Sequence, residues 1–493
     1  ARGGFAMTRC PVHHHGMTKA RGCEHVAVSK FSKLFPKLDG LEVSEADAVF
    51  LGGPGGLMHD FDGTSGDCAI PAGYIFFSQF VDHDITLDTT SKLRGAPLST
   101  EAINKLPNVR SPSLDLDCVY GFGPDGSPHI YDPERPGRLA VSPEGFDLAR
   151  SPGGVALIGD PRNDENIFVS QLQLLFHRFH NKIYSERLGH DPGGASGRFE
   201  LAQRQTRFHY QWLVLFDLLK RLCDRDTYRF AVSKLVQGKK EFPYFYEPYP
   251  HGLTMPVEFS VAAYRVGHTM VRSVYAVNDG NPDVELFDER FGTLGFTALP
   301  EELVVDWRYL LEVDECVKPR FSKAIDPLLA DELQNLPVVG SNNPSDRALA
   351  FRNLMRGNAL SLPSGQDVAG ALAARYPTVD TGFTPEIGRA GLEEATPLFY
   401  YVLAESKAKT DGQRLGPVGS AILLEVFGGM LKYCGTSFLH SEPEWSPDPC
   451  ISKERYAWWS EHYQQGFDKQ ALVDADDYYP FDLADVVRFV EEE

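Results

Sequence analysis

The chain has 493 residues, of which 42% are hydrophobic, and it carries 68 Asp and Glu against 48 Lys and Arg. This apolar share is that of an ordinary globular protein and excludes a disordered or fibrous chain. The net charge of −20 repels phosphate backbones, so nucleic acid is not an expected partner. The sequence has no run of about 18 uninterrupted apolar residues, and we therefore expect no membrane span.

Residues 1–45 are mixed in composition and basic in places, which predicts an N-terminal arm followed by one domain over 46–493. No signal-peptide core precedes Met7, and this leaves secreted and cytoplasmic locations both open. The eight cysteines include no Cys-x-x-Cys pair, so a structural zinc site is not expected. Disulfide pairing and oligomeric state stay open.

Apolar residues at helical spacing dominate the chain, and strand signals are sparse. The segment 208–222 is apolar nearly all round, which is typical of a helix buried in a large core. The other predicted helices cover 73–87, 165–188, 257–277, 397–408, 418–433 and a C-terminal segment around 483–490. We therefore predict a mainly α fold with one large helical core, long loops and little β structure.

The first chemical motif is the segment 79–84, Gln-Phe-Val-Asp-His-Asp. On a helix, Gln79 and His83 lie one turn apart and share a face. Asp82 and Asp84 flank the imidazole inside an otherwise apolar helix, where carboxylates are rarely buried without a partner. The pattern favours a proton carrier, an anchor and a cation ligand; the alternative is an exposed polar face.

A second motif places oxygen-bearing side chains at every second position: Ser111, Ser113, Asp115 and Asp117. Alternate residues of a loop can present their oxygens to one hard cation, and calcium takes six to eight of them. The glycine and the distal glutamate of an EF-hand are missing. The alternative is an ordinary Ser/Asp turn.

Three further segments contain charged or titratable residues. In 159–165, Arg162 precedes a predicted helix and is suited to an anion, while Glu165 favours the helix dipole. His268 lies in an apolar segment with Arg265 one turn earlier, where a lone histidine is more often part of the core. The segment 352–356, Arg-Asn-Leu-Met-Arg, is unremarkable by itself.

Taken in order, these segments resemble the animal-type haem peroxidases of the peroxidase–cyclooxygenase superfamily over residues 70–450. The matching patterns are Gln-x-x-Asp-His-Asp, Ser-x-Ser-x-Asp-x-Asp-x-Val-Tyr-Gly, Gly-Asp-x-Arg-x-x-Glu and Arg-x-Gly-His. The stretch 414–419, Arg-Leu-Gly-Pro-Val-Gly, looks most like the bacterial members. The resemblance implies reduction of hydrogen peroxide and oxidation of a small donor (iodide, bromide, thiocyanate or a phenol) through an oxoferryl intermediate. It also implies a part in the response to oxidative stress.

The resemblance implies haem b between the helices of His83 and His268. His268 would be the proximal iron ligand, and Asn353 would accept its ring N–H and so fix its tautomer. Arg265 and Arg356 would bind the haem propionates.

On the distal side, the resemblance makes His83 the acid–base residue for peroxide, with Arg162 stabilising charge as the O–O bond breaks. Gln79 would position the peroxide. Asp82 and Glu165 match the carboxylates that form ester bonds to haem methyl groups, so a covalently held haem is expected.

The resemblance also implies a calcium ion bound by Asp84 and by Ser111, Ser113, Asp115 and Asp117 of the loop. The ion would tie the residue next to His83 to a distant part of the chain and so hold the distal base in position.

Two departures from the family pattern bear on the substrate. Asn166 stands where chloride-oxidising members carry a methionine that forms a sulfonium link, so chloride should not be oxidised. Arg265 stands where the dioxygenases carry a radical-bearing tyrosine, and Tyr264 points about 100° away on a helix. The alternatives are a fatty-acid dioxygenase of the same superfamily and a non-catalytic, peroxidase-like adhesion protein.

Overall fold

The computed structural model describes residues 29–90, 92–187, 194–248, 252–287, 295–337, 339–447, 469–476 and 479–492. Its longer helices are α2 (Glu45–Gly52), α3 (Gly73–Ile85), α7 (Ile167–Lys182), α8 (Gly194–Trp212), α10 (Arg225–Val236), α14 (Leu349–Ala359), α15 (Gly365–Ala373), α17 (Leu398–Thr410), α18 (Pro417–Tyr433) and α22 (Leu483–Glu491). The shorter α-helices are α4 (Thr100–Ile103), α5 (Asp117–Tyr120), α6 (Gly123–Gly126), α9 (Leu219–Leu222), α11 (Val257–Ser260), α12 (Gly267–Met270), α13 (Pro344–Arg347), α16 (Ala390–Glu394), α19 (Phe438–Ser441) and α21 (Lys469–Asp474). The fold is mainly α, as the sequence predicted.

The β structure is limited to short pairings among the described residues. The strands are β1 (Ser29–Ser32), β2 (His59–Asp60), β3 (Asp67–Pro71), β4 (Pro107–Asn108), β5 (Thr254–Pro256), β6 (Val274–Tyr275), β7 (Val284–Glu285), β8 (Phe321–Lys323) and β9 (Leu329–Ala330). β1 pairs antiparallel with β4 and parallel with β5, and the other strands form two-stranded pairs. β1 thereby joins the start of the described chain to segments far along the sequence.

Residues 29–45 of the predicted arm are part of this body. Phe31 is buried in the core beside Leu34, and the carboxylate of Glu258 accepts hydrogen bonds from the backbone N–H groups of Leu34 and Phe35 at 2.8 and 3.1 Å. Residues 1–28 of the arm lie outside the described residues, and the division between arm and catalytic domain stays a prediction.

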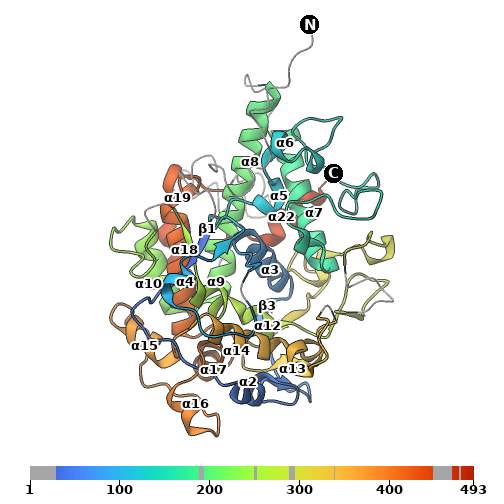
Figure 1. Cartoon of the computed structure of the whole chain (residues 1–493). Coiled ribbons are helices and arrows are strands. Elements are labelled where there is room, and N and C mark those ends of the chain that lie inside the picture. The colour runs from blue at the N-terminus through green and yellow to red at the C-terminus, as the bar shows by residue number, and fades with distance from the viewer. Residues whose placement is uncertain are drawn as a thin grey trace.

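The helix α3 lies near the centre of the molecule and packs against α7, which also contacts α8 and α22 (Figure 1). Aromatic rings fill the interface between α3 and α7. Phe76 stacks on Phe168 with ring centroids 4.4 Å apart, and Phe80 stacks on Phe176 at 5.0 Å. Burial of such large side chains contributes most of the hydrophobic stabilisation of a core. The polar residues of α3 are therefore carried by a helix that is held firmly in place.

The predicted continuous helix over 257–277 is wrong. The chain forms α11, a 3₁₀ turn η5 (Ala263–Val266), α12 and then β6. Ala262 leaves helical geometry, with φ −127° and ψ −76°. The Nε of Arg265 donates to the carbonyl of Ser260 at 3.0 Å, and this oxygen would otherwise accept from the backbone of a continuing helix. Several valines in the segment also lower its helix propensity. His268 is therefore carried by a single short turn.

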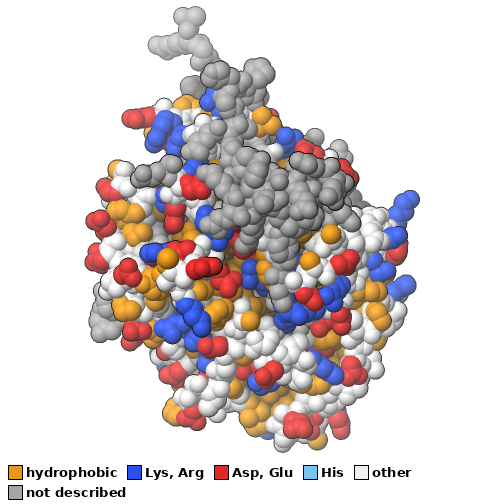
Figure 2. Space-filling view, turned by 180° about the vertical axis from the view of Figure 1, so that it is seen from behind, with side chains coloured by type: hydrophobic (Ala, Val, Ile, Leu, Met, Phe, Trp, Pro, Cys, Tyr) orange, Lys and Arg blue, Asp and Glu red, His pale blue; other side chains and the backbone are white. Residues whose placement is uncertain are grey.

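The surface seen in Figure 2 mixes acidic, basic and apolar side chains, so the excess of negative charge is not gathered in one patch on this face. No helix in the described ranges is both long and apolar enough to cross a bilayer.

Candidate functional site

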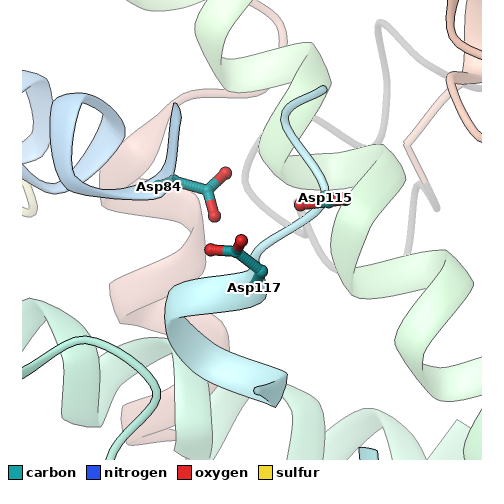
Figure 3. Close-up of side chains that lie close together, drawn as sticks. All are labelled: Asp84, Asp115 and Asp117. Carbon is teal, nitrogen blue, oxygen red and sulfur yellow. The ribbon is translucent and has the colours of Figure 1, made fainter. Parts of the chain in front are cut away.

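The loop before α5 brings three carboxylates together. Asp84 at the end of α3, Asp115 and Asp117 point toward one another, and one carboxylate oxygen from each lies within 4.8 Å of the others (Figure 3). Leu114 and Leu116 are fully buried in the core, so the residues between and beside them face the opposite way. The Oγ atoms of Ser111 and Ser113 form a hydrogen bond, and that of Ser113 donates to Asp115 at 2.7 Å. All five residues predicted for calcium are thus in one place.

The chemistry of this cluster fits a hard cation. Oδ1 of Asp84 and Oδ1 of Asp115 are buried and have no hydrogen-bond partner in the described part of the chain. Burial and the neighbouring Asp115 raise the pKa of Asp84 to about 7, and burial together with the two other carboxylates raises that of Asp117. Leu114 and Leu116 adopt positive φ angles of 51° and 61°, which are costly for non-glycine residues. A divalent ion would offset both the repulsion and the strain.

A buried ion-pair chain connects this loop with the segment before α7. Nε of Arg110 lies 2.7 Å from Oδ2 of Asp160, and its Nη1 lies 3.5 Å from Oδ1 of Asp117. Burial raises the pKa of Asp160, but Arg162 and Arg110 outweigh this effect and hold the pKa at about 2. Gly159 is required here, because a Cβ would lie 2.4 Å from the carbonyl oxygen of Asp117. The loop and the 159–165 segment therefore form one unit.

Arg162 lies in the 3₁₀ turn η2 (Pro161–Asp164), and its guanidinium spans from Asp160 to the end of α3. Nε donates to Asp160 at 3.1 Å, and Nη2 donates to Asp160 and to the carbonyls of His83 and Thr86 at 2.7, 3.0 and 2.9 Å. Nη1 makes no hydrogen bond within the described ranges. Arg162 thus fixes the end of α3 and keeps one free N–H group.

His83 is 5% exposed, and its ring is held by a hydrogen bond at Nδ1. Nδ1 lies 2.8 Å from the amide oxygen of Asn163, while Nε2 lies 3.7 Å from a carboxylate oxygen of Glu165. Burial and the guanidinium of Arg162 lower the pKa of His83 to about 3, so the ring is neutral at ordinary pH. A neutral ring with a free Nε2 is a proton acceptor.

Gln79, Glu165 and Asn166 form a polar group beside Nε2 of His83. Nε2 of Gln79 donates to Glu165 at 2.5 Å, and Nδ2 of Asn166 donates to Oε1 of Gln79 at 3.2 Å. Asn166 also caps α7, because its Oδ1 accepts from the backbone of Phe168 and Val169. Burial raises the pKa of Glu165 to about 7. Asn166 therefore both begins the helix and orients the distal side chains.

Asp82 lies on α3, next to His83, and its carboxylate makes no hydrogen bond or ion pair among the described residues. Burial raises its pKa, although the guanidinium groups of Arg265 and Arg162 act in the opposite direction. An unpaired, half-buried carboxylate is available for another partner.

His268, the second histidine of the site, lies on α12, which packs against α3, the helix that carries His83. Nδ1 of His268 lies 2.9 Å from Nδ2 of Asn353 on α14, and the amide oxygen of Asn353 accepts from Arg265 at 3.4 Å. The oxygen and the nitrogen of an amide have nearly the same shape, so either can face a histidine ring. His268 can bind iron through Nε2 only when its proton lies on Nδ1, and the amide oxygen of Asn353 must then face Nδ1. Nε2 of His268 makes no hydrogen bond in the described ranges.

Positive charge gathers around His268. Burial lowers the pKa of Arg265, and the nearby Arg356, Arg162 and Arg352 lower it further. Nη2 of Arg356 pairs with Asp88 at 2.6 Å. Arginines that repel one another indicate a place for an anionic ligand, and two carboxylates of a haem would supply it. With Nε2 of His268 available, the donor set fits a haem.

Three residues near His83 have no role in the sequence-based prediction: Asn163, Gln173 and Asp160. Only the Gly-Asp-x-Arg-x-x-Glu pattern singled out their neighbourhood. Gln173 and His177 are 0% exposed and lie on a buried face of α7, where apolar residues would be expected. Buried polar residues at i and i+4 of an apolar helix were the available signal.

Comparisons with known proteins place the whole chain beside its relatives. A sequence model described as animal haem peroxidase matches residues 94–369. A Dual oxidase of Drosophila melanogaster is 26% identical over 238 residues, a stretch that is 43% of this chain and 13% of that protein. The chain thus spans only a small part of the length of that relative.

Solved structures of the same fold include peroxidase A from Dictyostelium discoideum, with a TM-score of 0.59, 13% identity and coverage of 95% of this chain and 98% of that one. A fatty acid alpha-dioxygenase of Arabidopsis thaliana has a TM-score of 0.56, 15% identity and coverage of 94% and 80%. That of Oryza sativa has a TM-score of 0.57, 15% identity and coverage of 95% and 81%. The fold is thus shared by peroxidases and dioxygenases. Because the family model covers more than half of its length, the chain belongs to the animal haem peroxidase family.

Proposed function

We propose that this protein is a haem peroxidase that reduces hydrogen peroxide and oxidises a small donor such as iodide, bromide, thiocyanate or a phenol. The observation that carries the proposal is the pairing of two histidines on facing elements, with different partners. His83 has a free Nε2 beside Arg162, Gln79 and Glu165, whereas His268 has an amide at Nδ1 and arginines around it. A binding module requires neither arrangement.

In this proposal, Nε2 of His83 takes a proton from the incoming peroxide and returns it to the oxygen that leaves as water. The low pKa of His83 keeps the ring neutral before the first transfer. Nη1 of Arg162 donates toward the charge that develops as the O–O bond lengthens. Gln79, held by Asn166 and Glu165, orients the peroxide. The haem, when bound, supplies the two electrons that peroxide reduction requires.

His268 would bind the haem iron through Nε2, with Asn353 accepting the Nδ1 proton, and Arg265 and Arg356 would bind the propionates. Asp82 and Glu165 would form ester links to the haem. The unpaired carboxylate of Asp82 and the raised pKa of Glu165 support this assignment. After peroxide treatment, haem should stay with the denatured chain in mass spectrometry, and Asp82→Asn together with Glu165→Gln should release it. Free haem from the treated wild type would contradict the links.

We also propose that Asp84, Ser111, Ser113, Asp115 and Asp117 bind one calcium ion. The two orphaned carboxylate oxygens and the strained loop support it. The ion would hold Asp84, and with it the end of α3 next to His83. The likeness of 414–419 to bacterial members also leads us to propose a bacterial-type relationship.

The test of the reaction starts with the purified chain. A Soret band and a pyridine haemochrome establish haem, and stopped-flow mixing with peroxide establishes the reaction. Turnover is expected with iodide and phenols. Chlorination of monochlorodimedone is expected to fail, because Asn166 cannot form the sulfonium link that would raise the potential. Efficient chlorination, or no haem, would contradict the proposal.

A second candidate function is a fatty acid dioxygenase, because two solved dioxygenases share the fold over at least 94% of this chain. The site favours it less. The resemblance puts Arg265 at the position of the radical-bearing tyrosine. The hydroxyl of Tyr264 donates to the carbonyl of Ser78 at 3.3 Å, and its ring stacks on Phe259. Oxygen uptake with linoleate separates the two enzymes, and rapid uptake would favour the dioxygenase. An adhesion protein would show neither haem nor turnover.

A further inference from the structure

Behind His83, a chain of fully buried polar side chains leads away from the site through α7. Oδ1 of Asn163 lies 2.8 Å from Nδ1 of His83, and Nδ2 of Asn163 donates to Oε1 of Gln173 at 2.7 Å. Nε2 of Gln173 lies 2.9 Å from Nε2 of His177, whose Nδ1 lies 3.1 Å from the carbonyl oxygen of Ala140. Asn163, Gln173 and His177 are each 0% exposed, so no solvent competes with these bonds.

The direction of every bond in this chain follows from its far end. A backbone carbonyl only accepts, so Nδ1 of His177 carries a proton toward Ala140. Burial lowers the pKa of His177 to about 4, so its ring is neutral and Nε2 accepts. Gln173 must then donate from Nε2, and it does so a second time to the carbonyl of Cys118 at 3.1 Å. Its amide therefore cannot turn over without losing two acceptors.

The same reasoning extends to the distal base. Because Gln173 presents Oε1, Asn163 must donate from Nδ2 and present Oδ1 to His83. Oδ1 of an amide accepts only, so the proton of the neutral His83 ring lies on Nδ1. Nε2 is left with its lone pair, and it faces Glu165 and the rest of the distal group.

We propose that the chain Ala140–His177–Gln173–Asn163 sets the tautomer of His83, which makes Asn163, Gln173 and His177 positioning residues for its proton transfer. The inference rests on the proposed function, because it explains how His83 accepts a proton from the first encounter with peroxide. A ring free to exchange tautomers would spend part of the time with a proton on Nε2 and could not accept another there.

The environment of His83 adds no competing hydrogen bond to Nδ1 in the described ranges. The charged and titratable groups around the ring are Arg162 of η2, Asp160 just before it, Arg110 just before the loop 111–117, and Glu165 before α7. Glu165 is near Nε2. The tautomer is therefore decided by Asn163 and by what holds Asn163.

The decisive comparison uses two histidines of α7. His177 and His180 are both fully buried, and both bond a backbone carbonyl, but His180 pairs with Gly137 and Tyr120 and lies outside the chain. His177→Leu removes one of the two acceptors of Gln173 Nε2 and leaves the carbonyl of Cys118 to hold the amide alone, so the tautomers of His83 should begin to mix. His180→Leu removes a histidine of equal burial and should leave His83 unchanged. Asn163→Leu removes the acceptor itself, and Asn163→Asp restores one.

The readout is the ring ¹⁵N spectrum of His83 in protein labelled with ¹⁵N-histidine, assigned by its loss in His83→Gln. The spectrum is recorded on the diamagnetic carbon monoxide complex of the ferrous protein and on the chain as purified. Wild type, His180→Leu and Asn163→Asp should show one tautomer, protonated on Nδ1. His177→Leu and Asn163→Leu should show a mixture of the two tautomers.

Cyanide provides a second readout without turnover, because hydrogen cyanide must leave its proton on Nε2 of His83. Its association rate should fall about 10-fold in Asn163→Leu and recover in Asn163→Asp.

A single, unchanged tautomer in His177→Leu and Asn163→Leu, with wild-type cyanide rates, would overturn the inference. This failure is distinct from failure of the proposed function. A chain that binds no haem would contradict the peroxidase, while the ¹⁵N spectrum of the purified chain would still decide the tautomer.

Discussion

The two histidine regions of this protein are built in opposite ways. On the distal side, α3, the loop before α5 and the 159–165 segment are joined by ion pairs and hydrogen bonds that run from Asp117 through Arg110, Asp160 and Arg162 to the carbonyl of His83. On the proximal side, the chain around His268 breaks into short turns, and that ring has one hydrogen-bond partner in the described ranges, Asn353. The distal side is thus held by a continuous series of bonds within the chain, whereas the ring on the proximal side is held by one side chain.

The largest expected effect on the reaction with peroxide comes from a change at His83. His83→Ala should keep the haem, because the proximal ligand is intact, but slow the reaction with peroxide by about 10²–10⁴-fold. Stopped-flow absorbance in the Soret region measures the rate, and the pyridine haemochrome measures the haem content. A variant that reacts at the wild-type rate would remove His83 from the mechanism.

The proximal side should respond differently. Asn353→Leu removes the only side chain bound to Nδ1 of His268 in the described ranges, so haem affinity should fall by about 10–100-fold. Titration of the haem-depleted chain with haem measures the affinity. Asn358→Leu, at the end of the same helix, is a control, because its amide oxygen binds the backbone of Val43 instead. Equal losses in both variants would indicate general destabilisation.

Calcium removal tests the rigidity of the distal side, and the effect should depend on pH. Without the ion, burial and repulsion raise the pKa of Asp84 to about 7, compared with about 4 in the unfolded chain. The unfolded state then loses its proton first, so the stability of the chelated protein falls as pH rises from about 4 to 7. The ion cancels this loss by stabilising the charged form.

The melting temperature should therefore differ between calcium-loaded and EDTA-treated protein by several degrees more at pH 8 than at pH 5. Asp84→Asn should behave like the chelated protein at pH 5 and show a smaller pH dependence. A difference in melting temperature that is the same at both pH values would argue against this carboxylate cluster as the binding site.

The smallest effect is expected at Tyr264, on the proximal side. Its hydroxyl makes one long hydrogen bond, to Ser78, and its ring stacks on Phe259 and meets Phe427 edge to face. Tyr264→Phe keeps the packing and should cost about 1 kcal/mol or less of stability. Peroxidase turnover should be unchanged. A large loss of oxygen uptake with a fatty acid would instead assign a radical role to this tyrosine.

Local patterns predicted much of this architecture. Apolar spacing located α3, α7, α17, α18 and α22, because a helix that packs against a core must bury one face wherever it lies. The alternation in 111–117 predicted that four oxygen-bearing residues would converge, since Leu114 and Leu116 belong to the core. The helix over 257–277 failed, because the Arg265–Ser260 bond and the geometry at Ala262 depend on packing around the segment.

The sequence by itself determined the family, through four motifs whose residues lie close along the chain and whose order is fixed. It also determined the helical core and the identity of the residues that meet at the site. Only the tertiary structure decided how these residues are held. His83 and Asn163 are 80 residues apart, and Asn353 and His268 are 85 apart. Such bonds form because tertiary packing brings η2 against α3 and α14 against the turn of His268, so the side chains come within 3 Å, a distance that no local spacing encodes.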